Sequence, residues 1–293
     1  MIIIAAAASA CLSAQGPAGP SFDGARAYAH IQQLVGIGPR VAGTPGAAQA
    51  RAYIRKQLED LGLRVEEQSF DARTPLGPAR MVNLRAFVPG AASCGRLIFA
   101  GHYDTKRFED LTFVGANDGG SSAAFLIELA RVLKQRTNAR PIELLFLDGE
   151  EAVVEWQGDD HTYGSRYYVD QAKRDGSLKD IRALILVDMI GDRDLRIKRE
   201  TRSTPWLTDL IWRAAKDAGR PEFVEESTPI DDDHLAFLEA GVAATDLIDL
   251  DYPWWHQAGD TLDKVAPESL KAVGDVLLKA LPDLEKRTGS GGP

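Results

Sequence analysis

Two adjacent glutamates, Glu150 and Glu151, directly follow an apolar run in the segment FLDGEEAVVEWQGDDHTYGSR (146–166). Such a run is typical of a buried strand, so we expect both carboxyl groups at a strand end. Neighbouring carboxylates can divide two tasks, because one can bind a metal ion while the other transfers a proton. Trp156, six positions after Glu150, indicates which kind of molecule such a metal would act on.

Further acids and histidines mostly follow other apolar runs: His102, Asp104, Asp118, Asp188, the triplet Asp231 to Asp233, and His256. Ligands gather at the carboxyl ends of strands in open α/β sheets, so this recurrence favours one shared site. A single carboxylate there could instead cap a helix or stay solvated. Asp118 could cap the helix after it, but the glycines beside it would let the backbone approach a bound ion, which favours a ligand.

The candidate ligands are carboxylates and imidazoles, with no cysteine among them. Zinc accepts such a mixture, and a catalytic zinc uses three protein ligands and leaves a fourth position open. We therefore expect zinc, with manganese or cobalt as alternatives that ligand type does not exclude. His256 follows two tryptophans in YPWWHQAGDT and could instead be a half-buried histidine bonded to a neighbour.

The elements that must position these residues alternate between helical and strand patterns. Helical patterns cover residues 23–35, 45–61, 119–136, 163–174, 204–218 and 266–286. Strand patterns cover residues 64–72 and 80–88, followed by buried-type apolar runs at 96–104, 141–148, 181–189 and 242–249. The alternation predicts one α/β domain over residues 22–287, with a mostly parallel mixed sheet covered by helices on both faces.

Composition excludes several classes of protein. The chain has 293 residues, of which 44% are hydrophobic and 26% charged, and its net charge is −9 without a dense Lys/Arg run. This argues against nucleic acid as a partner.

Residues 1–21 pass from apolar to small residues, as an export signal does. No positive segment precedes them, so a misassigned start or a disordered tail is the alternative. The stretch MIIIAAAASACLSAQG (1–16) at the start of this segment is too short to span a bilayer, and Cys11 offers a lipid anchor as another alternative. Residues 288–293 are predicted to form a flexible tail.

Several motifs resemble those of a known superfamily. GHYDT (101–105), GANDGG (115–120), LLFLDGEEA (144–152), LVDMIGD (186–192) and the late histidine occur in this order in zinc aminopeptidase-like enzymes. The finer resemblance is to animal-type glutaminyl-peptide cyclotransferases, which convert an N-terminal glutamine to pyroglutamate and release ammonia. It rests on the tryptophan-containing insert after the glutamates, on the segment DDDHLAFLEAGV (231–242) and on Trp255 directly before His256.

The resemblance implies that Asp118, Glu151 and His256 bind one zinc ion per chain, and that Glu150 transfers the proton. Asp188 and Asp232 would complete a hydrogen-bonded acid network. The pocket for the glutaminyl side chain would be lined by Trp156, Trp255, Ile230 and Tyr252. We accordingly expect an exported, monomeric enzyme, periplasmic or secreted, that acts on peptides or proteins with an N-terminal glutamine.

Two other hypotheses remain. A two-zinc aminopeptidase would use His102, Asp118, Glu151, Asp188 and His256 as its five ligands, with Glu150 activating a bridging water. The insert and the DDDH segment favour the cyclase over this enzyme. A catalytically inactive binding domain would have lost ligands or glutamates, and none is missing here.

Overall fold

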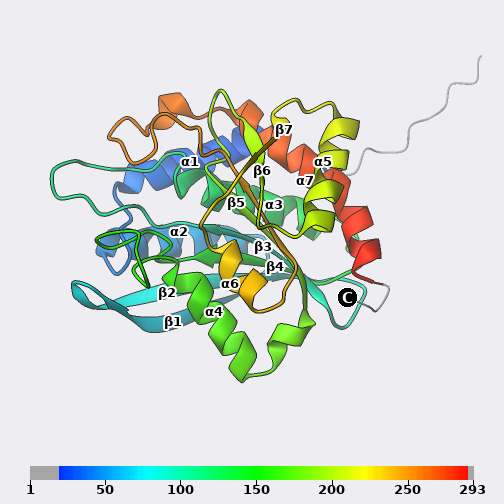
Figure 1. The fold of residues 1–293 in the computed structure, drawn as a ribbon, viewed down its shortest axis with the longest axis horizontal. Helices are drawn as coiled ribbons and strands as arrows, with labels where there is room; N and C mark the ends of the chain where they lie inside the picture. The colour runs from blue at the N-terminus through cyan, green and yellow to red at the C-terminus, as the bar shows by residue number, and fades with distance from the viewer. Residues whose placement is uncertain (1–19, 290–293) are drawn as a thin grey trace, which may run out of the picture.

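Six strands build the central sheet of the computed structural model, which describes residues 20–289. Their order is β1-β2-β4-β3-β5-β8, with bounds β1 (Arg64–Thr74), β2 (Gly77–Val88), β3 (Arg96–His102), β4 (Ile142–Leu147), β5 (Ile181–Asp188) and β8 (Ala244–Ile248). β4 pairs with β3, β3 with β5, and β5 with β8 in parallel, whereas the β1–β2 and β2–β4 pairs are antiparallel. The expected mostly parallel mixed sheet is confirmed (Figure 1).

The central strands are apolar at nearly every position because both faces of the sheet are covered. Successive side chains of a strand point to opposite faces. Leu97 and Phe99 of β3 accordingly lie in the larger buried cluster, whereas Ile98 and Ala100 lie in the smaller one. This explains why the sequence shows continuous apolar runs here rather than an apolar–polar alternation.

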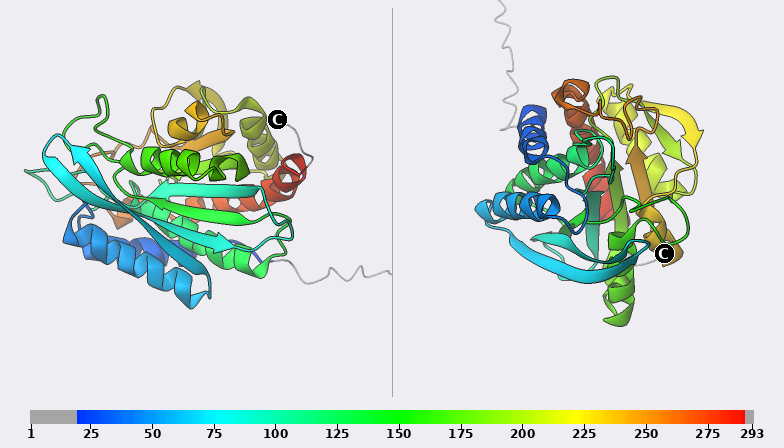
Figure 2. Two further views of the ribbon diagram at one scale, coloured as in Figure 1. Left: turned by 90° about the horizontal axis from the view of Figure 1, so that it is seen from below. Right: turned by 90° about the vertical axis from the view of Figure 1, so that its left-hand side faces the viewer.

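Helices cover the two faces of the sheet unequally. The larger cluster is completed by α1 (Gly24–Ile37), α2 (Pro45–Asp60), α3 (Gly120–Gln135), α5 (Pro205–Ala218) and α7 (Pro267–Arg287). The smaller cluster is completed by α4 (Tyr163–Arg174) and α6 (His234–Glu239). Figure 2 shows α2 and α4 on opposite faces of the sheet. Two short 3₁₀ turns complete the helical elements, η1 (Ser177–Asp180) and η2 (Leu262–Lys264).

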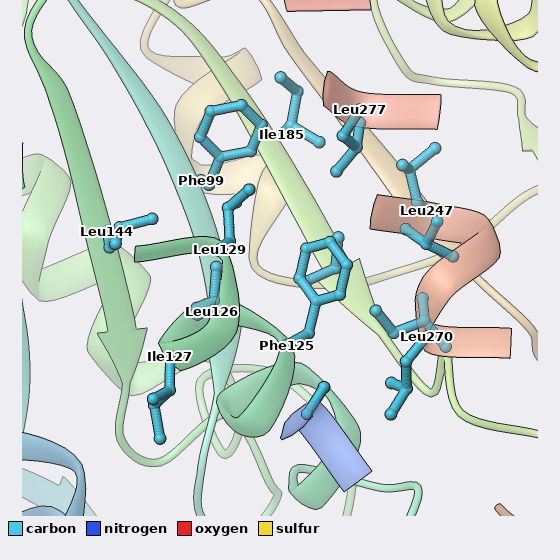
Figure 3. Close-up of a cluster of buried hydrophobic side chains, with 14 of the residues drawn as sticks. Phe99, Phe125, Leu126, Ile127, Leu129, Leu144, Ile185, Leu247, Leu270 and Leu277 are labelled. Atoms are coloured by element: carbon cyan, nitrogen blue, oxygen red, sulfur yellow. The ribbon is translucent and has the colours of Figure 1, made fainter. Parts of the chain in front are cut away.

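Helix α3 is the central helix and is buried on almost every side. Figure 3 shows Phe125 and Leu129 of this helix in one buried cluster with Phe99 and Ile185, which come from the sheet. A close-packed interior of this kind resists displacement, since moving one side chain requires others to move. The residues just before α3 are therefore joined to a rigidly held helix.

A small second sheet was not predicted from the sequence. It consists of β6 (Ile197–Glu200) and β7 (Phe223–Thr228), which pair in parallel. Most β7 residues are partly or fully exposed, so the strand carries few of the apolar residues by which a strand is recognised. Among residues 20–289, no helix is long and apolar enough to cross a membrane.

Candidate active site

The predicted site residues lie at the carboxyl edge of the parallel strands. His102 is the last residue of β3, and Asp188 is the last residue of β5. Glu150 and Glu151 lie in the loop after β4, and His256 lies in the loop after β8. Figure 1 shows the loops after β3 and β8 projecting from the same side of the molecule. The sheet thus brings together residues that are far apart in the sequence, as parallel topology predicts.

Asp118 reaches the site because the next residue is a glycine. Gly119 has a φ of 71° and is the N-cap of α3, and no side chain caps this helix. A Cβ at this position would lie 2.3 Å from the carbonyl oxygen of Asp104 and 3.0 Å from the ring of His102. Glycine therefore lets the Asp118 segment pass close to the end of β3, and the alternative that Asp118 caps the helix is wrong.

The carboxylates of Asp118 and Glu151 meet the imidazole of His256. His256 Nε2 lies 3.2 Å from the nearest oxygen of Glu151 and 3.5 Å from Oδ2 of Asp118. Oδ2 of Asp118 and Oε2 of Glu151 are buried and accept no hydrogen bond. Buried carboxylate oxygens without a partner are costly, so this donor set fits a bound cation, and its chemistry suits zinc.

His256 also has an unusual backbone conformation. Its φ is 55°, which lies in the left-handed region that non-glycine residues seldom adopt. The ring of Trp255 stacks on its imidazole with centroids 4.5 Å apart. Strained backbone of this kind concentrates at functional sites, where surrounding contacts hold it.

A second set of donors lies beside the first and shares Asp118. His102 Nε2 is 3.0 Å from Oδ1 of Asp188 and 3.3 Å from Oδ1 of Asp118, and these three residues could also hold a metal ion. They differ from the first set in access. Asp118, Glu151 and His256 all line the cavity at this site, whereas His102 is buried and is not among the lining residues.

Glu150 occupies a different position from Glu151. The backbone amides of both residues lie 3.3 Å from the carboxylate of Asp104, which accepts their hydrogen bonds. The side chain of Glu150 lies on the cavity wall, with Oε2 3.8 Å from Nδ1 of His102. Burial raises the pKa of Glu150 well above its usual value, and the nearby charges of Glu151 and Asp232 raise it further, although His102 opposes the shift.

Two of the predicted acids, Asp188 and Asp232, also line the cavity. Burial raises the pKa of both carboxyl groups, and the largest opposing influence on Asp188 is His102. Asp232 is further affected by Asp246 and Asp188, whose negative charges lie close by, and its Oδ2 accepts no hydrogen bond. Carboxyl groups that crowd in this way tend to share protons.

The cavity at this site has a volume of about 410 Å³ and is lined by both ionisable and apolar side chains. Its lining includes Trp156, Trp255 and Ile230, together with Val154, Met189, Pro229, Ile248 and Leu250. A concave site with apolar walls and a few convergent polar groups is typical of a small-molecule or side-chain pocket.

The expectation for Tyr252 needs correction. Its side chain is only 3% exposed, packs with Ile230 and Ile248, and is not among the residues that line the cavity. Its hydroxyl donates a hydrogen bond to Oδ1 of Asp260 at 2.7 Å. Tyr252 therefore supports the pocket from behind, because its phenol finds a buried carboxylate rather than the cavity.

Two residues that support the Asp118 segment were not predicted from the sequence. Asp260 accepts hydrogen bonds from the amides of Asn117 at 2.8 Å and Asp118 at 3.1 Å. Arg40 is fully buried, and its guanidinium donates to the carbonyls of Tyr103 and Gly115, both at 2.9 Å. Burial lowers the pKa of Arg40 to about 10, so it stays charged at neutral pH. Neither residue belongs to a motif with a recognisable spacing.

Comparison with known proteins identifies relatives with the same architecture. Residues 83–281 match peptidase family M28. The chain is 32% identical over 270 residues to the glutaminyl-peptide cyclotransferase-like protein of Mus musculus, an alignment that covers 81% of this chain and 70% of the relative. The structure of an Acidobacteriales bacterium glutaminyl cyclase superposes with a TM-score of 0.88 and 39% identity, covering 96% of this chain and all of that one.

A solved structure with another name is also similar. A leucine aminopeptidase precursor from Bacteroides thetaiotaomicron superposes with a TM-score of 0.82 and 28% identity, covering 89% of this chain and 97% of that one. The fold is thus shared by proteins named for cyclisation and for peptide hydrolysis, so the chemistry must be argued from the site.

Proposed function

We infer that this chain, which belongs to peptidase family M28 and to its glutaminyl-peptide cyclotransferases, converts the N-terminal glutamine of peptides or proteins to pyroglutamate and releases ammonia. One observation carries this function. Three side chains that could hold a metal ion and a separate carboxyl group, Glu150, line one cavity together with apolar side chains. The cavity can enclose an uncharged glutaminyl side chain while the polar groups contact the reacting atoms.

We propose that Asp118, Glu151 and His256 hold one zinc ion per chain. They are carboxylate and imidazole donors whose ligand atoms lie within 4.8 Å of one another, and two of their buried oxygens accept no hydrogen bond. A zinc ion held there would act as a Lewis acid on the side-chain carbonyl of the glutamine.

Glu150 is proposed to move the proton. The neutral α-amine of the substrate forms a bond to its own side-chain carbonyl carbon, and the carbon–nitrogen bond of the amide breaks. The attacking nitrogen must lose a proton, and the departing nitrogen must gain one to leave as ammonia. A single carboxyl group on the cavity wall can accept the first proton and donate the second, a role that contributes about a hundredfold to ten-thousandfold.

The neighbouring groups would keep Glu150 in place and adjust its affinity for the proton. His102 lies among four acids. Its Nδ1 is 3.5 Å from Asp104 and 3.8 Å from Glu150, and its Nε2 is bonded to Asp188 and lies 3.3 Å from Asp118. Burial and these charges disfavour a fully ionised cluster, and Asp232 adds to this effect. We propose that the network retains at least one shared proton during turnover.

The aromatic walls would exclude water from the reacting carbonyl. Trp156 and Trp255 come from different loops and line the same cavity. Water that reached the carbonyl would compete with the α-amine by hydrolysis. Enclosure by apolar side chains disfavours that reaction and strengthens the electrostatic interactions inside the cavity.

Release of ammonia from matched peptides tests the proposed function. A peptide that begins with glutamine should lose its side-chain nitrogen, whereas the same peptide with an acetylated N-terminus should release none, because its amine cannot attack. Ammonia from both peptides would instead indicate hydrolysis of the amide and would contradict cyclisation.

A two-metal aminopeptidase is the second candidate. The observation in its favour is the donor set of His102, Asp118 and Asp188, which lies beside the first and shares a ligand with it. We favour the single-zinc enzyme because all three donors of the first set line the cavity, whereas His102 of the second set is buried and does not.

We further propose that the enzyme acts as an exported monomer. Export is proposed from the apolar and small residues of segment 1–21, which includes Cys11 and lies almost wholly outside the described residues. Its substrates would be peptides or proteins that present a free N-terminal glutamine.

A further inference from the structure

The loop between β4 and α4 carries both glutamates and one wall of the cavity. Its two ends are joined by backbone hydrogen bonds. The amide of Thr162 donates to the carbonyl of Glu150, and the amide of Tyr163 donates to that of Gly149, both at 2.8 Å. The intervening residues therefore form a closed loop whose tip includes Trp156.

Asp160 lies at the centre of this loop and binds three successive amides. Its carboxylate accepts hydrogen bonds from the backbone of Val153 at 3.1 Å, Val154 at 2.8 Å and Glu155 at 2.9 Å. It also accepts one from the hydroxyl of Tyr163 at 2.6 Å. Val154 and Glu155 line the cavity immediately before Trp156, so Asp160 binds the backbone of the wall itself.

The charge of Asp160 strengthens these contacts. The side chain is 7% exposed, and burial alone would raise its pKa. The hydrogen bonds from Tyr163 and from the three amides outweigh burial and lower the pKa below its usual value. The carboxylate is therefore ionised at neutral pH, and hydrogen bonds to an ionised acceptor are stronger than those between neutral groups.

His161 contacts the wall from the other side. Its imidazole stacks on the indole of Trp156 with ring centroids 4.2 Å apart and planes 12° apart. The residue after it, Thr162, has a φ of 47°, which turns the chain sharply at this point. The indole is thus fixed by its own backbone on one side and by a ring on the other.

We propose that Asp160 is a positioning residue for the glutaminyl pocket, holding the backbone of residues 153–155 so that Trp156, backed by His161, forms a preformed wall. The inference rests on the proposed cyclisation. Glu150 is anchored separately, since its amide donates to Asp104 and not to Asp160. Loss of the Asp160 contacts should therefore weaken substrate binding more than it slows the chemical step.

Steady-state kinetics of Asp160→Ala test this role, with Asp159→Asn as the matched control. Asp159 is the adjacent acid, its side chain is 94% exposed, and it does not line the cavity. Asp160→Ala should raise KM for a glutamine-initiated peptide about fivefold or more while kcat stays within about twofold, because it removes interactions made equally in the ground state and transition state. Asp160→Asn should lie between it and the wild type, and the control should leave KM unchanged.

His161→Ala provides a second test that leaves the Asp160 hydrogen bonds intact. It should raise KM about twofold to threefold through loss of the stacked ring. If thermal unfolding shows that Asp160→Ala does not fold, the KM values of His161→Ala and Asp160→Asn test the positioning role instead. Wild-type KM values in the folded variants would overturn the positioning role alone, whereas a wild-type protein that fails to cyclise the peptide would overturn the proposed function.

Discussion

The side chains of the two adjacent glutamates reach different partners, and the separate tasks proposed for them rest on this difference. Both amides are held by Asp104, but the carboxylate of Glu151 meets His256 while that of Glu150 lies near His102. Although Asp104 binds the amides of both glutamates, their side chains can thus contact different groups, one a metal ion and the other a substrate. This separation explains why the two residues should respond differently to substitution.

Replacing Glu150 with glutamine should remove proton transfer and spare the metal. The amide has nearly the same shape but cannot accept and return a proton, so kcat should fall about a hundredfold to ten-thousandfold. Zinc content, measured by elemental analysis of the purified variant, should equal that of the wild type. A variant with undiminished cyclase activity would rule out this role for Glu150.

His102→Asn tests the number of metal ions. If the single zinc is held by Asp118, Glu151 and His256, the variant should keep one zinc per chain, because His102 is not one of these ligands. The control is His256→Asn, which removes a proposed ligand and should lower zinc affinity. Wild-type protein with two tightly bound zinc ions, one of which disappears in His102→Asn, would instead support the two-metal enzyme.

At the scale of the elements, the small second sheet supports the pocket through one buried acid. Glu200 ends β6, and its carboxylate accepts hydrogen bonds from Nε2 of His234 at 3.1 Å and from the amide of Arg202 at 2.9 Å. It also lies 3.3 Å from the amide of Ile230, which lines the cavity. Strand β6, which was not predicted from the sequence, therefore connects α6 to the pocket wall through Glu200.

Glu200→Gln should destabilise the protein in a pH-dependent manner. Burial would raise the pKa of Glu200, but the bonds from His234 and the amides lower it to about 2. A depressed pKa stabilises the fold above the usual value near 4.5, and this stabilisation is lost as the pH falls from there toward 2. The variant should therefore lose about 3 kcal/mol of unfolding free energy at neutral pH, and the difference should shrink below about pH 4.5.

Denaturant unfolding at a series of pH values measures this difference. Glu225→Gln is the control, because its side chain is 79% exposed and pairs with Arg199 at the surface. It should change the unfolding free energy by less than about 0.5 kcal/mol. An equal loss of stability for Glu200→Gln at every pH would show that the charge of this carboxylate does not stabilise the fold.

At the scale of the whole molecule, the sequence predicted the layers better than it predicted the supports of the site. The apolar runs of β3, β4 and β5 revealed the sheet because strands covered on both faces are apolar throughout. By contrast, β7 is mostly polar, and α6 has only six residues, too few for a clear helical period. These elements depend on tertiary contacts that a local pattern does not encode.

The same distinction applies to the candidate site, where some residues could be predicted from the sequence and others could not. Strand-end positions and motifs indicated Asp118, Glu150 and their partners, and the structure brings these residues to one cavity. Arg40 and Asp260 were missed because each acts through backbone groups brought close only by folding. Tyr252 was assigned to the cavity from the family resemblance, whereas its hydroxyl bonds to Asp260 and the residue does not line the cavity.

Removing the metal should lower the stability of the whole molecule as well as its activity. The proposed zinc ligands include two buried carboxylates with unpaired oxygens, whose repulsion a cation would relieve. A ligand that binds only the folded state stabilises it, so chelation should lower Tm by about 5 °C or more. Scanning fluorimetry before and after chelation measures the change, and added zinc should restore both Tm and activity. An unchanged Tm would contradict a tightly bound metal.

The central claim is that one metal-dependent site cyclises glutamine rather than hydrolysing peptides. The most direct test incubates the purified protein with a glutamine-initiated peptide and with its leucine-initiated twin, and records both masses with and without a chelator. We predict a loss of about 17 Da from the glutamine peptide alone, abolished by chelation, because ammonia leaves as the ring closes. Release of free leucine from the twin, with no loss of ammonia from the glutamine peptide, would contradict the account and identify an aminopeptidase.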